Sequence, residues 1–129
     1  AVCAKTEAEL ADLGEEDAKL YLLDLGIENS GLERLAQKAF KTLGLITFLT
    51  AGEKEVRAWT LPVGTPAVKA SGVIHTDFMN KFIKAEVVKF ADFIECKGWK
   101  GAREKGKARL EGRDYIVQDG DVVEFKIGA

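Results

Sequence analysis

The chain has 129 residues, of which 47% are hydrophobic and 31% are charged, and its formal net charge is −2. This size and composition favour one globular domain, or one small domain plus a fragment, and argue against a membrane protein. A single histidine and two distant cysteines, Cys3 and Cys96, disfavour a zinc site, and the cysteines are typical of a reducing, cytoplasmic setting. We expect no signal peptide, because residues 1–5 lead directly into acidic sequence.

Helical signals dominate the first 44 residues. The short apolar start Ala1–Lys5 resembles the end of a strand, and residues 7–13 form a short helix candidate. The acidic turn at residues 15–17 predicts a second helix that ends at Gly26. Ser30 and Glu33 have the spacing of a capping box, which predicts a third helix that continues to Gly44.

The pattern changes at Leu45. Residues 45–50 are rich in β-branched and aromatic side chains, and residues 55–61 follow after a glycine-containing turn, so the two segments predict a β-hairpin. Thr65 and Pro66 then predict the start of a helix over residues 67–71, with Thr65 as the N-cap. Residues 82–90 alternate weakly and predict a third strand.

The run Tyr115–Ile127 contains the strongest strand signal. Val123, Phe125 and Ile127 alternate with residues 122, 124 and 126, a period that buries one face of a strand. An edge strand this apolar would promote aggregation, so we expect a central one. The order of elements from residue 45 onward predicts an α+β domain with a mixed sheet.

Positive charge gathers before this last strand. Residues 45–129 carry 14 basic and 12 acidic side chains, whereas residues 1–44 carry five and nine. Basic residues beside an aromatic one, Trp99, are typical of a nucleic-acid contact. The basic residues of this stretch are Lys97, Lys100, Arg103, Lys105, Lys107, Arg109 and Arg113. The same residues also fit a solvated charged loop that binds nothing.

Other motif-like matches are weaker. Residues 101–107 fit the spacing of a phosphate-binding loop, but Ala108 stands where magnesium needs Ser or Thr, and no buried strand precedes the match. Residues 98–101 have the GxxG spacing of a KH clamp without its long flanking helices. Nothing positions His75, Asp77 and Cys96 as a nucleophilic set. We therefore expect no catalytic residue and no metal site.

Several longer blocks resemble a known family. Residues 43–60, 72–78, 85–88 and 109–125 closely resemble the carboxyl-terminal part of the YchF family, which comprises Obg-like P-loop ATPases and GTPases. The resemblance implies that residues 45–129 form a TGS domain with a ubiquitin-like β-grasp fold, in which the last strand lies parallel to the first. Residues 1–44 would then be the helical carboxyl-terminal remnant of the P-loop nucleotide-binding domain.

The same resemblance implies where nucleotide chemistry belongs. Cys3, Ala4 and Lys5 align with the loop that touches the purine base, with cysteine in place of the usual serine. The P-loop and the switch regions would lie upstream, so we expect no enzyme activity and no cofactor for this chain. The intact parent would bind and hydrolyse ATP or GTP with magnesium.

The expected partners are RNA or the ribosome, contacted through the basic stretch, and the parent nucleotide-binding domain. The alternative is a purely structural or intramolecular docking domain without RNA contact. Exposed helices within residues 20–43 could also form a dimer, and no membrane contact is expected.

Overall fold

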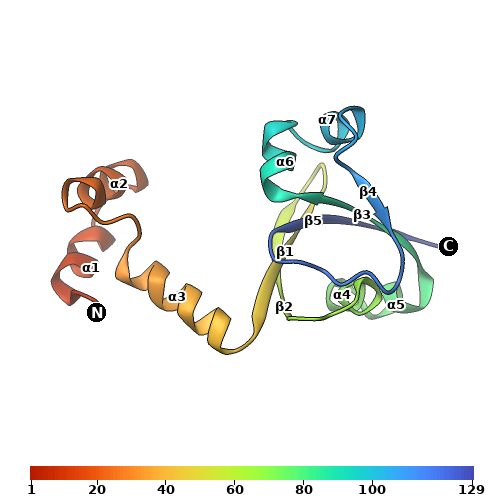
Figure 1. Cartoon of the computed structure of the whole chain (residues 1–129), viewed down its shortest axis with the longest axis horizontal. Coiled ribbons are helices and arrows are strands. Elements are labelled where there is room, and N and C mark those ends of the chain that lie inside the picture. The colour runs from red at the N-terminus through yellow and green to blue at the C-terminus, as the bar shows by residue number, and fades with distance from the viewer. The chain divides into compact units, whose positions relative to one another are not determined.

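A computed structural model describes residues 1–129, which divide into two compact units, residues 1–43 and residues 44–129 (Figure 1). The first unit is helical, and the second contains every strand together with four helices. None of the helices combines the length and the apolar character that a membrane span requires.

The first unit consists of three helices. Their bounds are Ala4–Ala11 for α1, Glu15–Asp24 for α2 and Gly31–Thr42 for α3. The predicted strand end at Ala1–Lys5 is wrong, because α1 begins at Ala4 and its first turn closes with a hydrogen bond from the Glu7 N–H to the Cys3 carbonyl. The second helix ends as predicted, with Gly26 at a φ of 68°.

The predicted capping box starts α3. The Ser30 Oγ accepts a hydrogen bond from the Glu33 N–H at 3.1 Å, and the Glu33 carboxylate accepts one from the Ser30 N–H at 2.9 Å. Glu7 of α1 accepts two more, from the Gly31 N–H at 2.6 Å and the Leu32 N–H at 3.3 Å. These bonds satisfy amides that have no partner inside the helix, and they fasten α1 to the start of α3.

The second unit is built on one five-stranded mixed sheet. Its strands are β1 (Leu45–Ala51), β2 (Val56–Pro62), β3 (Phe82–Lys89), β4 (Arg109–Glu111) and β5 (Asp121–Ile127). The order across the sheet is β2-β1-β5-β3-β4. The last strand is central as predicted: it runs parallel to β1, with Leu49 opposite Val122, and antiparallel to β3. The predicted α+β fold with a mixed sheet, in which the last strand lies parallel to the first, is confirmed.

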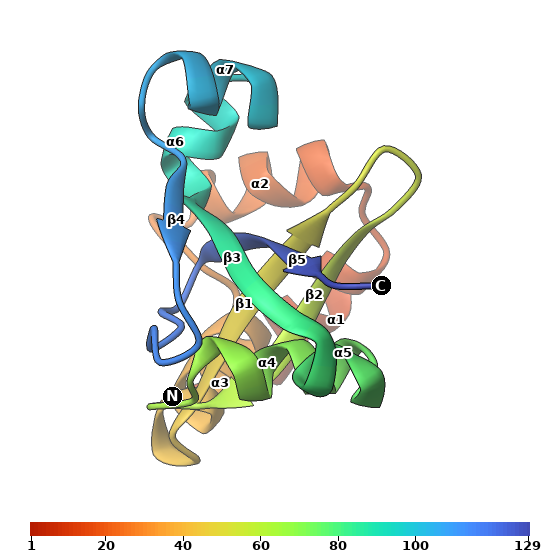
Figure 2. The same ribbon diagram turned by 90° about the vertical axis from the view of Figure 1, so that its right-hand side faces the viewer.

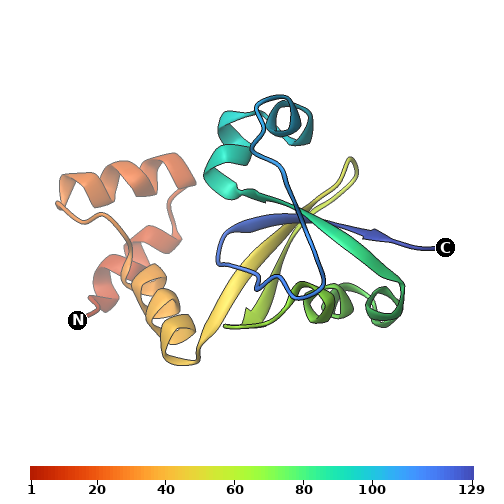
Figure 3. The same ribbon diagram turned by 45° about the vertical axis from the view of Figure 1, so that its right-hand side comes forward.

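Helices cover the sheet in two pairs, α4 (Ala67–Ile74) with α5 (Thr76–Lys81), and α6 (Phe90–Glu95) with α7 (Trp99–Glu104). Figures 2 and 3 show the two pairs on opposite sides of the strands. The main core lies between the sheet and α4. Its buried residues are Phe48, Leu61, Ala67, Ala70, Phe82, Ala85, Val87, Val117 and Val123. A smaller cluster of Val88, Cys96 and Ala102 joins β3 to α6 and α7.

The start of α4 differs from the prediction by one position. Pro66 occupies the N-cap, and the Thr65 hydroxyl donates to the Pro62 carbonyl at 2.6 Å instead of capping the helix. Pro66 is extended because it forms a β-bridge with Ile116, a partner 50 positions further along the chain. A distant contact therefore overrides the local start signal.

The segment between β4 and β5 is held in place by hydrogen bonds to the buried carboxylate of Asp121. Asp121 is fully buried and accepts hydrogen bonds from the Lys89 ammonium at 2.7 Å, the Tyr115 hydroxyl at 2.7 Å and the Gln118 N–H at 2.8 Å. Burial and this carboxylate raise the pKa of Tyr115 to about 12. The three donors compensate the cost of burying the charge.

Candidate nucleic-acid interface

The basic stretch contains a helix that the sequence did not predict, α7. Lys97 and Gly98 have positive φ angles of 57° and 105°, and this sharp turn directs the chain into α7. Gly101 lies inside the helix, where an added Cβ would stand 1.9 Å from the Cys96 carbonyl oxygen. The glycines of this stretch thus allow two short helices to pack closely.

Arg103 on α7 is occupied by carboxylates of the sheet. Its Nε and Nη2 bind the two oxygens of Glu86 at 2.8 and 2.7 Å, and Nη2 also lies 3.0 Å from a Glu124 oxygen. Glu86 is 6% exposed, and hydrogen bonding from Arg103 lowers the pKa of its carboxyl group. This forked pairing is a positioning contact between α7, β3 and β5.

Four other cations of the stretch also have partners. The ion pairs are Lys105 with Glu95 at 3.7 Å, Lys107 with Asp92 at 3.2 Å and Arg109 with Glu111 at 3.8 Å. Arg113 donates to the carbonyls of Phe82 at 3.2 Å and Met79 at 3.4 Å. These contacts stay within the unit, so most of the predicted positive surface is already neutralised or used to hold the fold.

Lys97 and Lys100 differ from the other five. Both are exposed, and neither forms an ion pair. Trp99, the aromatic residue of the predicted nucleic-acid contact, lies between them and is half-buried. Its Nε1 donates to the Ala51 carbonyl at 2.8 Å, and its ring meets Phe93 edge-on with the centroids 5.3 Å apart. Trp99 therefore fastens α7 to the β1–β2 hairpin.

A groove lies beside this tryptophan, with a volume of about 860 Å³. Trp99, Lys100 and Arg103 line it from α7, and residues 50–53 of the hairpin line the other side. Glu53 and Glu124 also contribute to its lining, so the groove carries charges of both signs. Among the predicted nucleic-acid residues, the structure thus gathers Trp99, Lys100 and Arg103 at one hollow and leaves Lys97 on the preceding turn.

The predicted base loop lies in the first unit and begins a helix. Cys3 is the exposed N-cap of α1, Ala4 and Lys5 are its first residues, and Lys5 lies 3.9 Å from Glu9. Hydrogen bonds from Thr6 lower the pKa of the Cys3 thiol. A hollow of about 220 Å³ adjoins Cys3 and is also lined by residues 29–31 and Arg34.

The phosphate-loop spacing at residues 101–107 has no phosphate-binding geometry. Residues 101–104 are helical, and the amides of residues 105, 106 and 107 donate to carbonyls of residues 101, 103 and 102. A phosphate cradle needs such amides free. No group of three or more acidic, histidine or cysteine side chains is placed to hold a metal ion.

Sequence reasoning missed Glu86, which decides the role of Arg103. The available signal was a carboxylate within the apolar run of β3, since a charge buried in a strand needs a cation nearby. The identity of that cation depended on how α7 packs, which no local pattern reveals.

Comparisons with known proteins agree with the fold. A family model described as "YchF-GTPase_C: Protein of unknown function (DUF933)" matches residues 45–128. The chain is 55% identical to "Ribosome-binding ATPase YchF" of Pasteurella multocida over 97% of its length, covering 34% of that protein. It is 48% identical to "Obg-like ATPase 1" of Caenorhabditis elegans over 95% of its length, covering 31% of that protein.

A solved structure extends this similarity to three dimensions. The Schizosaccharomyces pombe YchF GTPase matches with a TM-score of 0.81 and 34% identity, over 97% of this chain and 33% of that one. The chain thus spans about a third of the length of the relatives that it matches. Both the family model and this match include the sheet with the central last strand. The chain therefore belongs to the YchF family and corresponds to its carboxyl-terminal region.

Proposed function

We propose that this chain is a TGS-type binding module through which a YchF-type ATP- or GTP-binding protein attaches to ribosomal RNA. The observation that carries the proposal is similarity over 97% of the chain to proteins named as ribosome-binding ATPases. Two exposed lysines without carboxylate partners, Lys97 and Lys100, offer the phosphate contacts that such attachment needs.

The proposed contact is narrower than the full basic stretch. Lys97 and Lys100 would meet phosphates directly, while the half-buried Trp99 holds the turn between them against the hairpin. The other five cations of the stretch already have partners inside the unit; they are Arg103, Lys105, Lys107, Arg109 and Arg113. They would contribute to binding mainly by supporting this geometry.

Nucleotide hydrolysis is proposed for the intact relatives and not for this chain. The one segment with the spacing of a phosphate loop, residues 101–107, uses the amides of residues 105–107 in hydrogen bonds to carbonyls of α7. Cys3, Ala4 and Lys5 would contribute to a purine site only together with other parts of a P-loop domain. Titration of ATP and GTP with magnesium into the chain should therefore give no heat of binding, and clear binding would contradict this assignment.

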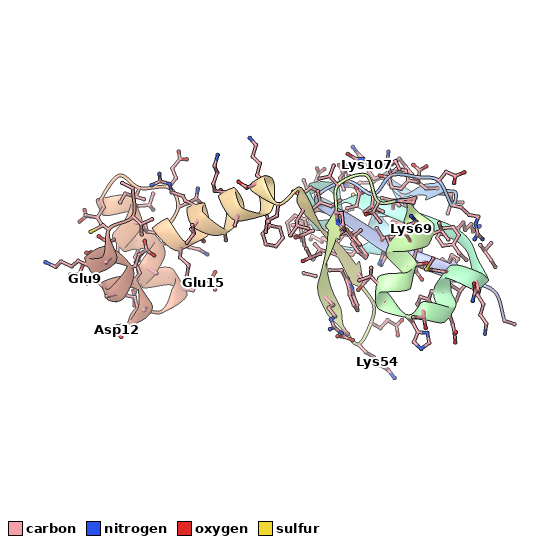
Figure 4. All side chains as sticks on the ribbon, turned by 90° about the horizontal axis from the view of Figure 1, so that it is seen from below. Glu9, Asp12, Glu15, Lys54, Lys69 and Lys107 are labelled. Carbon is pink, nitrogen blue, oxygen red and sulfur yellow. The ribbon has the colours of Figure 1, made fainter.

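The test of the RNA contact is charge reversal at both free lysines. We expect Lys97→Glu with Lys100→Glu to reduce co-sedimentation with ribosomes and to lower the dependence of affinity on salt by about 0.7–0.9 per lost phosphate contact. The matched control is Lys69→Glu, because Lys69 is exposed on α4 (Figure 4). Figures 2 and 3 show α4 on the other side of the strands from α7.

An unchanged ribosome association in the folded double variant would contradict the proposal. It would favour the alternative, in which the module docks within its own protein without touching RNA.

A further inference from the structure

The long edge of the sheet at β2 has free backbone groups. Hydrogen bonds from the Val63 N–H to the Gly44 carbonyl and from the Gly52 N–H to the Glu55 carbonyl lie at the two ends of the β1–β2 ladder. Because hydrogen-bonded and non-bonded pairs alternate in an antiparallel ladder, residues 57, 59 and 61 point their amides toward β1. The amides of Val56, Ala58 and Thr60 therefore point away from the sheet.

This edge lacks the usual protection. Arg57 is the only charged residue of β2, Pro62 stands at its very end, and the register with β1 contains no bulge. Val56, Ala58 and Thr60 are exposed, and Val56 is 70% exposed. Native proteins normally blunt a seven-residue edge with lysines, prolines or bulges, or they cover it with another segment.

Arg57 is held in place beside the edge without a carboxylate partner. Its guanidinium lies over the Trp59 ring, 4.3 Å from the centroid, and the Trp59 Nε1 donates to the Thr50 hydroxyl at 2.9 Å. No ion pair of the chain includes Arg57. A hollow of about 510 Å³ adjoins it, lined by Arg57, Trp59, Ile74 and the hairpin turn. Glu53, Lys54 and Glu55 of that turn also line the hollow, and neither carboxylate forms an ion pair with Arg57.

The geometry points to β2 as a docking edge for an extended, acidic segment of a partner protein, which adds a sixth strand. Its backbone would pair with the outward groups of Val56, Ala58 and Thr60. Its side chains opposite residues 57 and 59 would stand close to them, because those positions are non-hydrogen-bonded pairs in the new ladder. A carboxylate of the partner segment opposite Arg57 would form the ion pair that Arg57 lacks. An aliphatic side chain of the same segment would cover Trp59 and Ile74.

A second copy of this chain fits the edge less well. Two copies could pair their β2 strands antiparallel, with all three outward amides of each copy in hydrogen bonds. In that register Arg57 lies opposite Trp59 of the second copy. Both guanidinium groups then remain without a carboxylate. Val56 at one end of this edge lines the same groove as Lys100. The outward backbone groups and Arg57 take no part in the proposed RNA contact, so the inference extends that contact and does not depend on it.

The test begins with random twelve-residue peptides displayed on phage and selected on the 129-residue chain, with Ala58→Pro for counter-selection. Proline at 58 removes an outward N–H and leaves the β1 ladder intact, and circular dichroism checks the fold. We expect selected peptides to alternate β-branched residues and to carry Asp or Glu. We expect Arg57→Glu, a surface change that keeps the strand, to weaken their binding about tenfold or more, as for loss of a charge-assisted contact.

Amide hydrogen exchange then locates the bound peptide. We expect the best synthesised peptide to slow exchange at Val56, Ala58 and Thr60, while Arg57, Trp59 and Leu61 are slow already. Three outcomes would overturn the inference: no enrichment over the counter-selection, equal binding to Ala58→Pro, or slow exchange of the three amides in a peptide-free dimer.

Discussion

At the scale of single residues, Asp121 holds the segment between β4 and β5. Its carboxylate is fully buried and accepts hydrogen bonds from Lys89, Tyr115 and Gln118. Asp121→Ala would leave an ammonium, a hydroxyl and an amide without their acceptor, so we expect it to lower the free energy of unfolding by about 3 kcal/mol. Urea denaturation followed by tryptophan fluorescence measures the change.

The control at this site is Tyr115→Phe. It removes one donor and keeps the other two, so it should cost about 1 kcal/mol. Equal losses in the two variants would show that the hydroxyl, and not the carboxylate, organises the segment between β4 and β5.

The same contact makes Tyr115 a probe of alkaline pH. Burial and the Asp121 carboxylate raise its pKa from 10.0 to about 12. The folded state therefore keeps this proton after the unfolded chain has lost it, so the stabilisation is complete below pH 10 and is lost as the pH rises toward 12.

The titration is best followed in a Tyr21→Phe background, because the pKa of Tyr21 is also raised, by its hydrogen bond to Glu9. Tyrosinate absorbance should then show a midpoint near 12 while the chain is folded. A midpoint near 10, the ordinary value, would mean that the hydroxyl does not meet Asp121 in solution.

At the scale of elements, close packing of α6 and α7 depends on Gly101. A Cβ at this position would stand 1.9 Å from the Cys96 carbonyl, so Gly101→Ala has to push the two helices apart. We expect a loss of about 2 kcal/mol in unfolding free energy, typical of overpacking. It should also move the NMR signals of the Trp99 indole, whose hydrogen bond to Ala51 depends on the placement of α7.

Gly112→Ala is the matched control. This glycine has no heavy atom within 4 Å of the added Cβ and no positive φ, so its substitution should change stability by less than about 0.5 kcal/mol. A Gly101 variant as stable as this control would show that α6 and α7 are not packed as described.

Elements with strong local signals are the ones that sequence reasoning can find. The capping box at Ser30 and the apolar run of β5 each depend on neighbours within a few residues, and both elements are present. The predicted alternation of burial in β5 is wrong, because Val122 is as buried as Val123 and Ile127 is exposed. The helix α7 was missed because glycine inside a helix is unfavourable unless a distant backbone approaches it, as Cys96 does at Gly101.

The candidate site shows the same limit. A sequence reveals seven cations between Lys97 and Arg113, but the carboxylates that neutralise them come partly from other elements. Glu86 and Glu124 lie on β3 and β5, and they reach Arg103 only because α7 packs across those strands. Which cations remain free is therefore a property of the tertiary structure.

At the scale of the whole molecule, exposed apolar side chains are concentrated in residues 1–43. On α3, Leu32 is 68% and Leu35 is 59% exposed. Such a face favours association, so we expect the chain to form dimers at high concentration and Leu35→Glu to shift it toward the monomer. Sedimentation equilibrium measures both. If residues 44–129 alone associate as strongly as the whole chain, the helices are not the dimer contact.

The central position of β5 has a consequence for synthesis of the protein. Without β5, the sheet order leaves two separate pieces, β1 with β2 and β3 with β4. At roughly 5–20 residues per second of translation, several seconds separate the two parallel strands at the centre of the sheet. During that time β1 and β3 each have one edge without a partner strand. We therefore expect this unit to fold only after β5 has left the ribosome.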